Sequence, residues 1–148
     1  MRVQSMTNTD TNDVEASLEQ CRRMISKGSE LVRLTTQGKR ELHNLARIRD
    51  TLHAEGLNTP VVADIHFKAD LALEASSLVD KIRINPGNYL KGDLLDAPLT
   101  ELISACKKSG ASIRIGVNHG SLNESILNSY GDTPEGMAES AMQFLRVC

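Results

Sequence analysis

The chain has 148 residues, 40% hydrophobic and 24% charged, which is the composition of one globular domain with a buried core. A net charge of −2, 3% aromatic residues and no tryptophan argue against a nucleic-acid-binding surface. No apolar run approaches the roughly 20 residues of a membrane span, and residues 1–11 lack the apolar core of a signal peptide. Three widely spaced cysteines without a C-x-x-C pair indicate a reduced, cytoplasmic protein without a metal site.

Short β-branched runs alternate with amphipathic stretches along the first half of the chain. Residues 3–6, 31–34 and 60–65 predict strands, whereas residues 14–25 and 42–52 carry apolar side chains at helical spacing. We expect glycines to end both helices. The first helix is expected to begin at an Asn12 cap.

The second half continues the alternation. Residues 71–78 and 95–106 predict helices, residues 81–85 and 112–118 predict strands, and a last helix begins with Pro134 at its first position. Residues 85–88 are expected to form a loop, and Ser121 with Glu124 a capping box that would offer free N–H groups to an anion. About five βα units imply a parallel sheet, which would be either doubly wound or part of a barrel. No glycine-rich nucleotide-binding fingerprint follows a strand.

Polar side chains interrupt the predicted strands on one face. A doubly wound sheet is covered by helices on both faces and has nearly continuous apolar strands. A barrel tolerates polar residues because its inner face opens into a site at the carboxyl ends of the strands. The pattern therefore favours a TIM-barrel type of α/β fold. The polar residues on the strands and at their ends are Arg33, Asp64, His66, Arg83, Asn85, Arg114 and Asn118.

Three arginines, Arg33, Arg83 and Arg114, would converge on one mouth. Like charges in a partly dry space are unfavourable unless an anion neutralises them, and guanidinium groups match phosphate oxygens. The prediction is a small polyanion such as a diphosphate. The alternative is a structural network in which Asp64, other acids or water satisfy the arginines. His66, beside Asp64, is predicted to join the site as an acid, a base or a donor.

Four long strings resemble the 4-hydroxy-3-methylbut-2-enyl diphosphate synthase family. They are VQSMTNTDT from Val3, VADIHF from Val62, RINPGN from Arg83 and RIGVNHGSL from Arg114, and the last resembles the longer form of the family. Residues 130–134 and 139–142 extend the resemblance, which covers essentially the whole chain.

The resemblance implies an isoprenoid-pathway oxidoreductase that opens and dehydrates 2-C-methyl-D-erythritol 2,4-cyclodiphosphate, held in a TIM barrel. It implies a [4Fe–4S] cluster in a separate C-terminal domain, with ferredoxin or flavodoxin as electron donor. It identifies no catalytic residue in this chain. The positions that it assigns to substrate binding are Arg33, Asp64, His66, Arg83, Asn85, Arg114, Asn118 and Ser121.

The chain also departs from that family. A full barrel takes about 250 residues, so residues 1–148 would form a partial barrel that is inactive alone. Cys21, Cys106 and Cys148 do not match the cluster pattern, so the cluster ligands are expected outside this chain. Residues 89–97 look shorter than in long-form relatives. Open sheet edges predict self-association, and a homodimer of the full-length protein is compatible with this reading.

Two other functions remain open from the sequence. One is a dihydropteroate-synthase-like TIM-barrel transferase, which also binds a diphosphate ester. The other is a non-catalytic anion-binding module.

Overall fold

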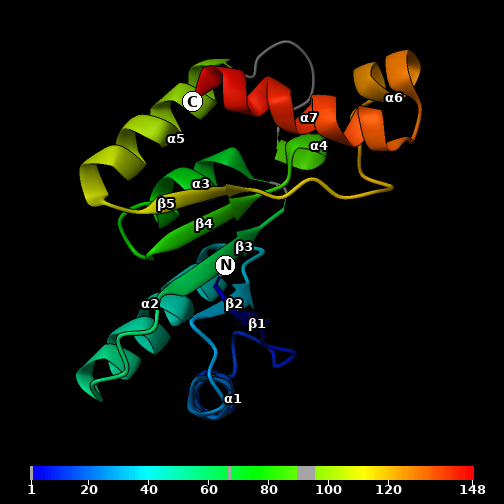
Figure 1. The fold of residues 1–148 in the computed structure, drawn as a ribbon. Coiled ribbons are helices and arrows are strands. Elements are labelled where there is room, and N and C mark those ends of the chain that lie inside the picture. Colours follow the sequence, from blue (N-terminus) through cyan, green and yellow to red (C-terminus); the bar gives the residue numbers. More distant parts are fainter. Residues whose placement is uncertain (1, 67, 90–95) are drawn as a thin grey trace.

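The computed structural model describes residues 2–66, 68–89 and 96–148, in which five strands form one parallel sheet (Figure 1). The strand order β1-β2-β3-β4-β5 is the order along the chain. A doubly wound sheet reverses its order at a switch point, whereas a barrel does not. The predicted partial barrel of the α/β class is therefore confirmed. The strands are β1 (Gln4–Met6), β2 (Leu31–Thr35), β3 (Val61–Ile65), β4 (Lys81–Ile84) and β5 (Ser112–Ile115).

Helices follow the strands and cover one face of the sheet. Helix α1 contacts β2, α2 contacts β3, α3 contacts β3 and β4, and α5 contacts β5. Helices α4, α6 and α7 gather near the carboxyl ends of β4 and β5 (Figure 1). The helices are α1 (Val14–Ser26), α2 (Lys39–Ala54), α3 (Ala69–Ala75), α4 (Pro86–Tyr89), α5 (Asp96–Ser109), α6 (Glu124–Tyr130) and α7 (Pro134–Val147).

The core lies between the sheet and these helices. Its sheet side consists of every second strand residue, and each such Ile, Val or Leu contributes about 1.5–3 kcal/mol by its burial. The helices supply the leucines that the sequence periodicity predicts, such as Leu42, Leu45 and Leu52 on α2. The opposite face of the sheet carries the interrupting polar residues, as predicted. The sheet residues of the core are Val32, Leu34, Val61, Ala63, Ile65, Ile82 and Ile84.

Most predicted helix ends are confirmed. Gly28 follows α1 with a φ of 96°, and Gly56 follows α2 with a φ of 80°. These conformations are strained for other residues, so glycine stops the helix there. Thr133 caps α7 by accepting a hydrogen bond from the Gly136 amide, with Pro134 at the first helical position.

The predicted cap of α1 is wrong. The carboxylate of Asp13, rather than Asn12, accepts the hydrogen bond from the Ala16 amide. The Asn12 side chain instead donates to Glu41 on α2 at 2.8 Å and accepts from Asn44 at 3.2 Å. The Asn12 side chain, which could have capped α1, is therefore engaged in tertiary hydrogen bonds with α2.

The strand ends also differ from the prediction. Strand β4 ends at Ile84 and β5 at Ile115, and the predicted loop at residues 85–88 contains the single helical turn α4. Pro86 presets the helical φ, and the Asn85 side chain accepts a hydrogen bond from the Gly87 amide at 3.2 Å. Together these two residues begin a helical turn where the sequence suggests only a bend.

Some expectations lie outside the described residues. They include Phe67, the predicted start of the fifth helix at Leu95, and the apparent shortening across residues 89–97, of which 90–95 are not described. Within the described ranges, no helix is both long enough and apolar enough to cross a bilayer.

Candidate anion-binding site at the carboxyl ends of the strands

A row of polar residues crosses four strands near their carboxyl ends. The register pairs Thr35 with Asp64, Asp64 with Arg83, and Arg83 with Arg114. Paired residues of adjacent parallel strands point to the same face of the sheet. Arg33 precedes Thr35 by two residues, so it lies on that face as well. The predicted convergence of the three arginines on one face is therefore present in the sheet.

Asp64 is at the centre of this row. Its carboxylate lies 3.1 Å from Nη1 of Arg83, 3.6 Å from Nε of Arg33 and 3.4 Å from Nε2 of His66. The Asp64 side chain is only 2% exposed. A buried carboxylate is tolerated when cationic groups and hydrogen bonds compensate its desolvation. The arginines of β2 and β4 supply that compensation.

Arg83 is held firmly. Its side chain is 8% exposed, and besides the bond to Asp64 its Nη2 donates to the carbonyl oxygen of Gly116 at 2.6 Å. These two contacts come from β3 and from the segment after β5, so they fix the guanidinium from both neighbouring strands. Arg83 is therefore a preorganised cation whose position does not depend on a ligand.

Arg33 and Arg114 are more accessible. The side chain of Arg33 is 21% exposed, and its guanidinium contacts the sulfur of Met6 at 2.9 Å and 3.2 Å. A thioether is a weak acceptor, so this contact leaves the positive charge in place. Arg114 is exposed on the edge strand β5, and its side chain makes no hydrogen bond or ion pair with any other described residue. Both side chains are therefore accessible to an anion, although Arg33 also contacts Asp64.

The charge balance decides between the two interpretations of this cluster. Asp64 carries one negative charge, whereas Arg33, Arg83 and Arg114 carry three positive charges, so the row has an excess of two. The structural network expected as an alternative exists, since Asp64 contacts Arg33, Arg83 and His66. It neutralises only one of the arginines, however. The remaining charge favours binding of an anion.

A second group of residues forms the adjoining wall. The buried side chain of Asn85 donates to Oγ of Ser121 at 3.0 Å, and that hydroxyl donates to the carbonyl of Asn118 at 3.0 Å. A Cβ at Gly87 would lie 1.4 Å from the Ser121 carbonyl oxygen, so only glycine permits this backbone contact. The loop after β5 therefore packs directly against α4, with the Ser121 backbone against Gly87. The side chain of Asn118 is exposed, and its backbone makes this contact.

The predicted capping box at Ser121 is wrong. Asn123 caps α6 by accepting from the Ile126 amide at 2.9 Å, and Glu124 is the first helical residue. Ser121 is engaged with Asn85 and Asn118 instead. Asn123 therefore replaces Ser121 as the cap residue, and the binding of an anion at the start of α6 stays a prediction.

The structure brings the predicted site residues into two connected groups. In the first group Arg33, His66 and Arg83 each contact the Asp64 carboxylate, whereas Asn85, Asn118 and Ser121 form the wall. Arg114 joins the first group through its register with Arg83 alone. Sequence reasoning missed the roles of Met6 and Gly116. A glycine interrupting a β-branched run marks a close approach, which could have drawn attention to residue 116.

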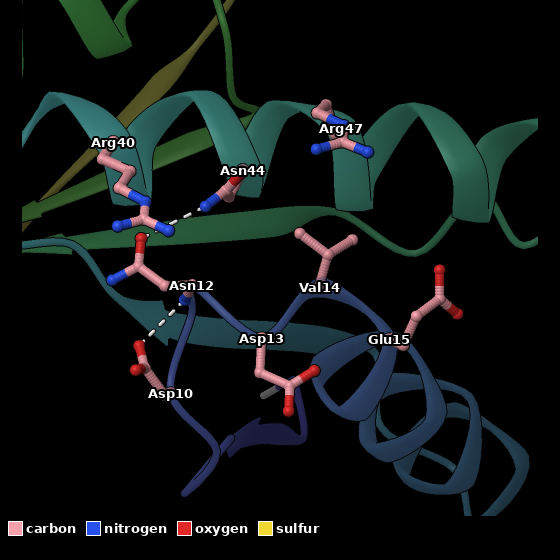
Figure 2. Close-up of a pocket in the computed structure, with 8 residues that line it drawn as sticks. All are labelled: Asp10, Asn12, Asp13, Val14, Glu15, Arg40, Asn44 and Arg47. Carbon is pink, nitrogen blue, oxygen red and sulfur yellow. Dashed lines mark hydrogen bonds between the residues drawn. The ribbon is translucent and has the colours of Figure 1, made fainter.

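A separate groove of about 630 Å³ lies between the start of α1 and α2 (Figure 2). Figure 2 shows Arg40 and Asn44 on α2 opposite Asn12, which hydrogen-bonds to Asp10 and Asn44. Three carboxylates outnumber the two arginines, so the groove has no excess of positive charge. It does not fit a diphosphate. Its lining residues are Asp10, Asn12, Asp13, Val14, Glu15, Arg40, Asn44 and Arg47.

The cysteines of the chain do not form a cluster site. Cys21 and Cys106 are buried on different helices, and burial raises the pKa of Cys21 to about 11 and also raises that of Cys106. Metal-binding thiolates need a lowered pKa. Across residues 2–66, 68–89 and 96–148, no three His, Cys, Asp or Glu side chains come together as metal ligands. These residues do not fit an iron–sulfur cluster.

Comparison with known proteins gives a family match over the whole chain. The profile of the GcpE TIM-barrel domain matches residues 1–148. The chain is 46% identical to a 4-hydroxy-3-methylbut-2-en-1-yl diphosphate synthase (flavodoxin) of Phocaeicola vulgatus, and 45% identical to the protein of that name from Bacteroides thetaiotaomicron. It is 42% identical to that of Chlorobaculum tepidum. Each alignment covers 100% of this chain.

The alignments cover only 27%, 27% and 22% of those relatives, so the chain spans about a quarter of their length. Among solved structures, a 2,3-dimethylmalate lyase of the PEP mutase/isocitrate lyase superfamily has a similar fold. It aligns with a TM-score of 0.54 at 11% identity, over 97% of this chain and 55% of the lyase. That likeness concerns the fold alone.

Proposed function

Because the chain belongs to the GcpE TIM-barrel family, we propose that it forms the diphosphate-binding part of a 4-hydroxy-3-methylbut-2-en-1-yl diphosphate synthase. The proposed substrate is 2-C-methyl-D-erythritol 2,4-cyclodiphosphate, and the proposed reaction is its reductive ring opening and dehydration. Of the three functions left open by the sequence, the family match favours this one.

The excess of positive charge at the carboxyl ends of the strands carries the proposal. Three arginines and one carboxylate share that face of the sheet, and two of the arginines, Arg33 and Arg114, are accessible. A cyclic diphosphate carries one negative charge on each phosphate, which matches this excess. Arginine forks bind phosphate oxygens in bidentate fashion. A neutral substrate would leave the charges of the row uncompensated.

The remaining residues have supporting parts in the proposal. Arg83 provides a fixed cation that a ligand need not reorganise, which lowers the entropic cost of binding. Asn85 and Ser121 hold the wall beside the phosphates. The imidazole of His66, whose side chain is 34% exposed, lies 3.4 Å from the Asp64 carboxylate at the border between this buried group and solvent.

The electrons for ring opening have to come from a redox group. In the proposed enzyme a [4Fe–4S] cluster supplies them, and its ligands are not among the described residues, whose cysteines do not fit it. We propose flavodoxin as the electron donor, since the relatives carry it in their names. The cytoplasmic location expected from the sequence stays a prediction.

Calorimetric titration of the cyclodiphosphate into this chain tests the proposal. Replacement of Arg114 by alanine removes an accessible charged donor, and a hydrogen bond to a charged group contributes about 1.5–3 kcal/mol. The Kd should therefore rise about ten- to hundredfold. Arg47→Ala, which removes an exposed arginine from the groove of Figure 2, is the matched control and should leave the Kd unchanged. Equal affinities of wild type and Arg114→Ala would refute the proposal.

A further inference from the structure

We infer that Gly116 is a positioning residue for Arg83, because the missing side chain at position 116 creates the space in which the guanidinium of Arg83 lies. The inference deepens the proposed function, on which its consequence for anion binding rests.

The backbone of Gly116 is tied to β4 on both sides of the residue. Its amide donates to the carbonyl of Ile84 at 2.8 Å, which continues the pairing of β5 with β4 beyond the last strand residue. Its carbonyl accepts from Nη2 of Arg83 at 2.6 Å. The Cα of Gly116 is therefore held against the arginine, and it cannot move away without breaking these bonds.

The space at this Cα is already filled by Arg83. A Cβ at position 116 would lie 2.2 Å from Nε, 3.0 Å from Cζ and 3.1 Å from Cδ of that side chain. Gly116 is not among the glycines with a positive φ, so the backbone conformation does not require glycine. The requirement is steric and comes from one neighbour. Nε of Arg83 is buried without a hydrogen-bond partner, as expected for an atom pressed against a Cα.

Burial and the salt bridge to Asp64 together confine the Arg83 side chain. It is almost fully buried, and its Nη1 is bound to Asp64 at 3.1 Å. A methyl group at position 116 would displace the guanidinium and lengthen this bond. Asp64 would then lose its main partner, and its contacts with Arg33 and His66 would shift. A single glycine thus sets the geometry of the charged row.

The test combines a ligand-free measurement with a binding measurement. The ligand-free measurement follows the Nε–Hε resonance of Arg83 by ¹⁵N-edited NMR in wild type, in Gly116→Ala and in the control Gly38→Ala. The control adds the same methyl group at a glycine without positive φ, where the nearest atom is the flexible end of Glu41 at 3.1 Å. The resonance should move in Gly116→Ala and stay in place in Gly38→Ala.

The binding measurement uses inorganic pyrophosphate as the probe. Gly116→Ala should raise its Kd about tenfold or more, which corresponds to one lost charged hydrogen bond. Adding Gly116→Ala to Arg83→Ala should have no further effect, because the clash is gone. If Arg83→Ala does not fold, the Nε–Hε resonance of Arg83 in Gly116→Ala still tests whether Gly116 positions Arg83.

An unchanged Arg83 resonance, or unchanged pyrophosphate affinity in folded Gly116→Ala, overturns the inference. A structural role of Gly116 without any role for Arg83 would lower stability but leave both quantities unchanged. If wild type itself does not bind pyrophosphate, the proposed function fails, and the resonance alone decides the role of Gly116. The two failures are therefore distinguishable.

Discussion

Replacement of Asp64 by asparagine tests the charged row most sharply, since it keeps the shape of the side chain and removes its charge. The carboxylate faces Arg83 at 3.1 Å and Arg33 at 3.6 Å, and it is 2% exposed. Removing one partner of a buried ion pair costs about 3–5 kcal/mol, because the other charge stays buried without compensation. Arg33 adds little to this, since it is partly exposed and its charge is screened by solvent.

Urea unfolding measures this loss. With a slope of about 2 kcal/mol per M, the midpoint of Asp64→Asn should fall by about 1.5–2.5 M at an unchanged slope. The matched control is Glu19→Gln, which breaks the Arg23–Glu19 pair at 2.9 Å, where the side chains are 63% and 68% exposed. Exposed pairs on a helix contribute only about 0.3–0.5 kcal/mol. If Asp64→Asn loses no more stability than Glu19→Gln, burial does not govern the energetics of the row and the reasoning is refuted.

Four further predictions concern Gly87, the reactivity of the cysteines, the pH dependence of stability and the sheet edges. Gly87→Ala should lower the unfolding midpoint and release the loop after β5, because its Cβ would lie 1.4 Å from the Ser121 carbonyl oxygen; unchanged amide exchange at Ser121 would contradict this. A thiol reagent at pH 8 should modify exposed Cys148 first and Cys21 only on unfolding, since burial raises the pKa of Cys21 to about 11. The unfolded chain gives up that proton first, so the contribution of Cys21 to stability should fall as the pH rises from 9.0 to about 11, and a Cys21→Ala chain should lack this loss. Finally, β1 and β5 are unpaired sheet edges, so sedimentation should show concentration-dependent association of this chain, whereas a monomer at all concentrations would argue against it.

The polar face of the sheet was predictable because a strand has a period of two residues. Side chains two apart in a strand must share a face, so Arg83 and Asp64 could be assigned to the inner face from their own strands alone. The barrel interpretation followed from the same alternation. These features depend on local geometry, which the sequence determines directly.

The partners of the polar residues were not predictable in the same way. Asn12 has the right chemistry for a helix cap, yet it binds Glu41, which lies 29 residues away in the sequence. Ser121 likewise contacts Asn85, 36 residues earlier, instead of capping α6. Such side chains can bond to a local or to a tertiary partner. Which partner they bind depends on how the neighbouring helices and strands pack.

The difference between the three arginines also came from tertiary structure. Their strand positions are equivalent by sequence, but Arg83 lies on β4 between two neighbouring strands, whereas Arg114 lies on the edge strand β5. Burial and the backbone at Gly116 fix Arg83, and exposure leaves Arg114 open. Sequence periodicity gives the face of a residue and not its accessibility.

A crystal structure of this chain with bound 2-C-methyl-D-erythritol 2,4-cyclodiphosphate tests the central claim most directly. Both phosphates should lie at the carboxyl ends of β2–β5, with oxygens within hydrogen-bond distance of the Arg33 and Arg114 guanidinium groups and with Arg83 still bound to Asp64. Phosphates bound elsewhere, for instance in the groove between α1 and α2, with Arg114 pointing into solvent, would contradict it.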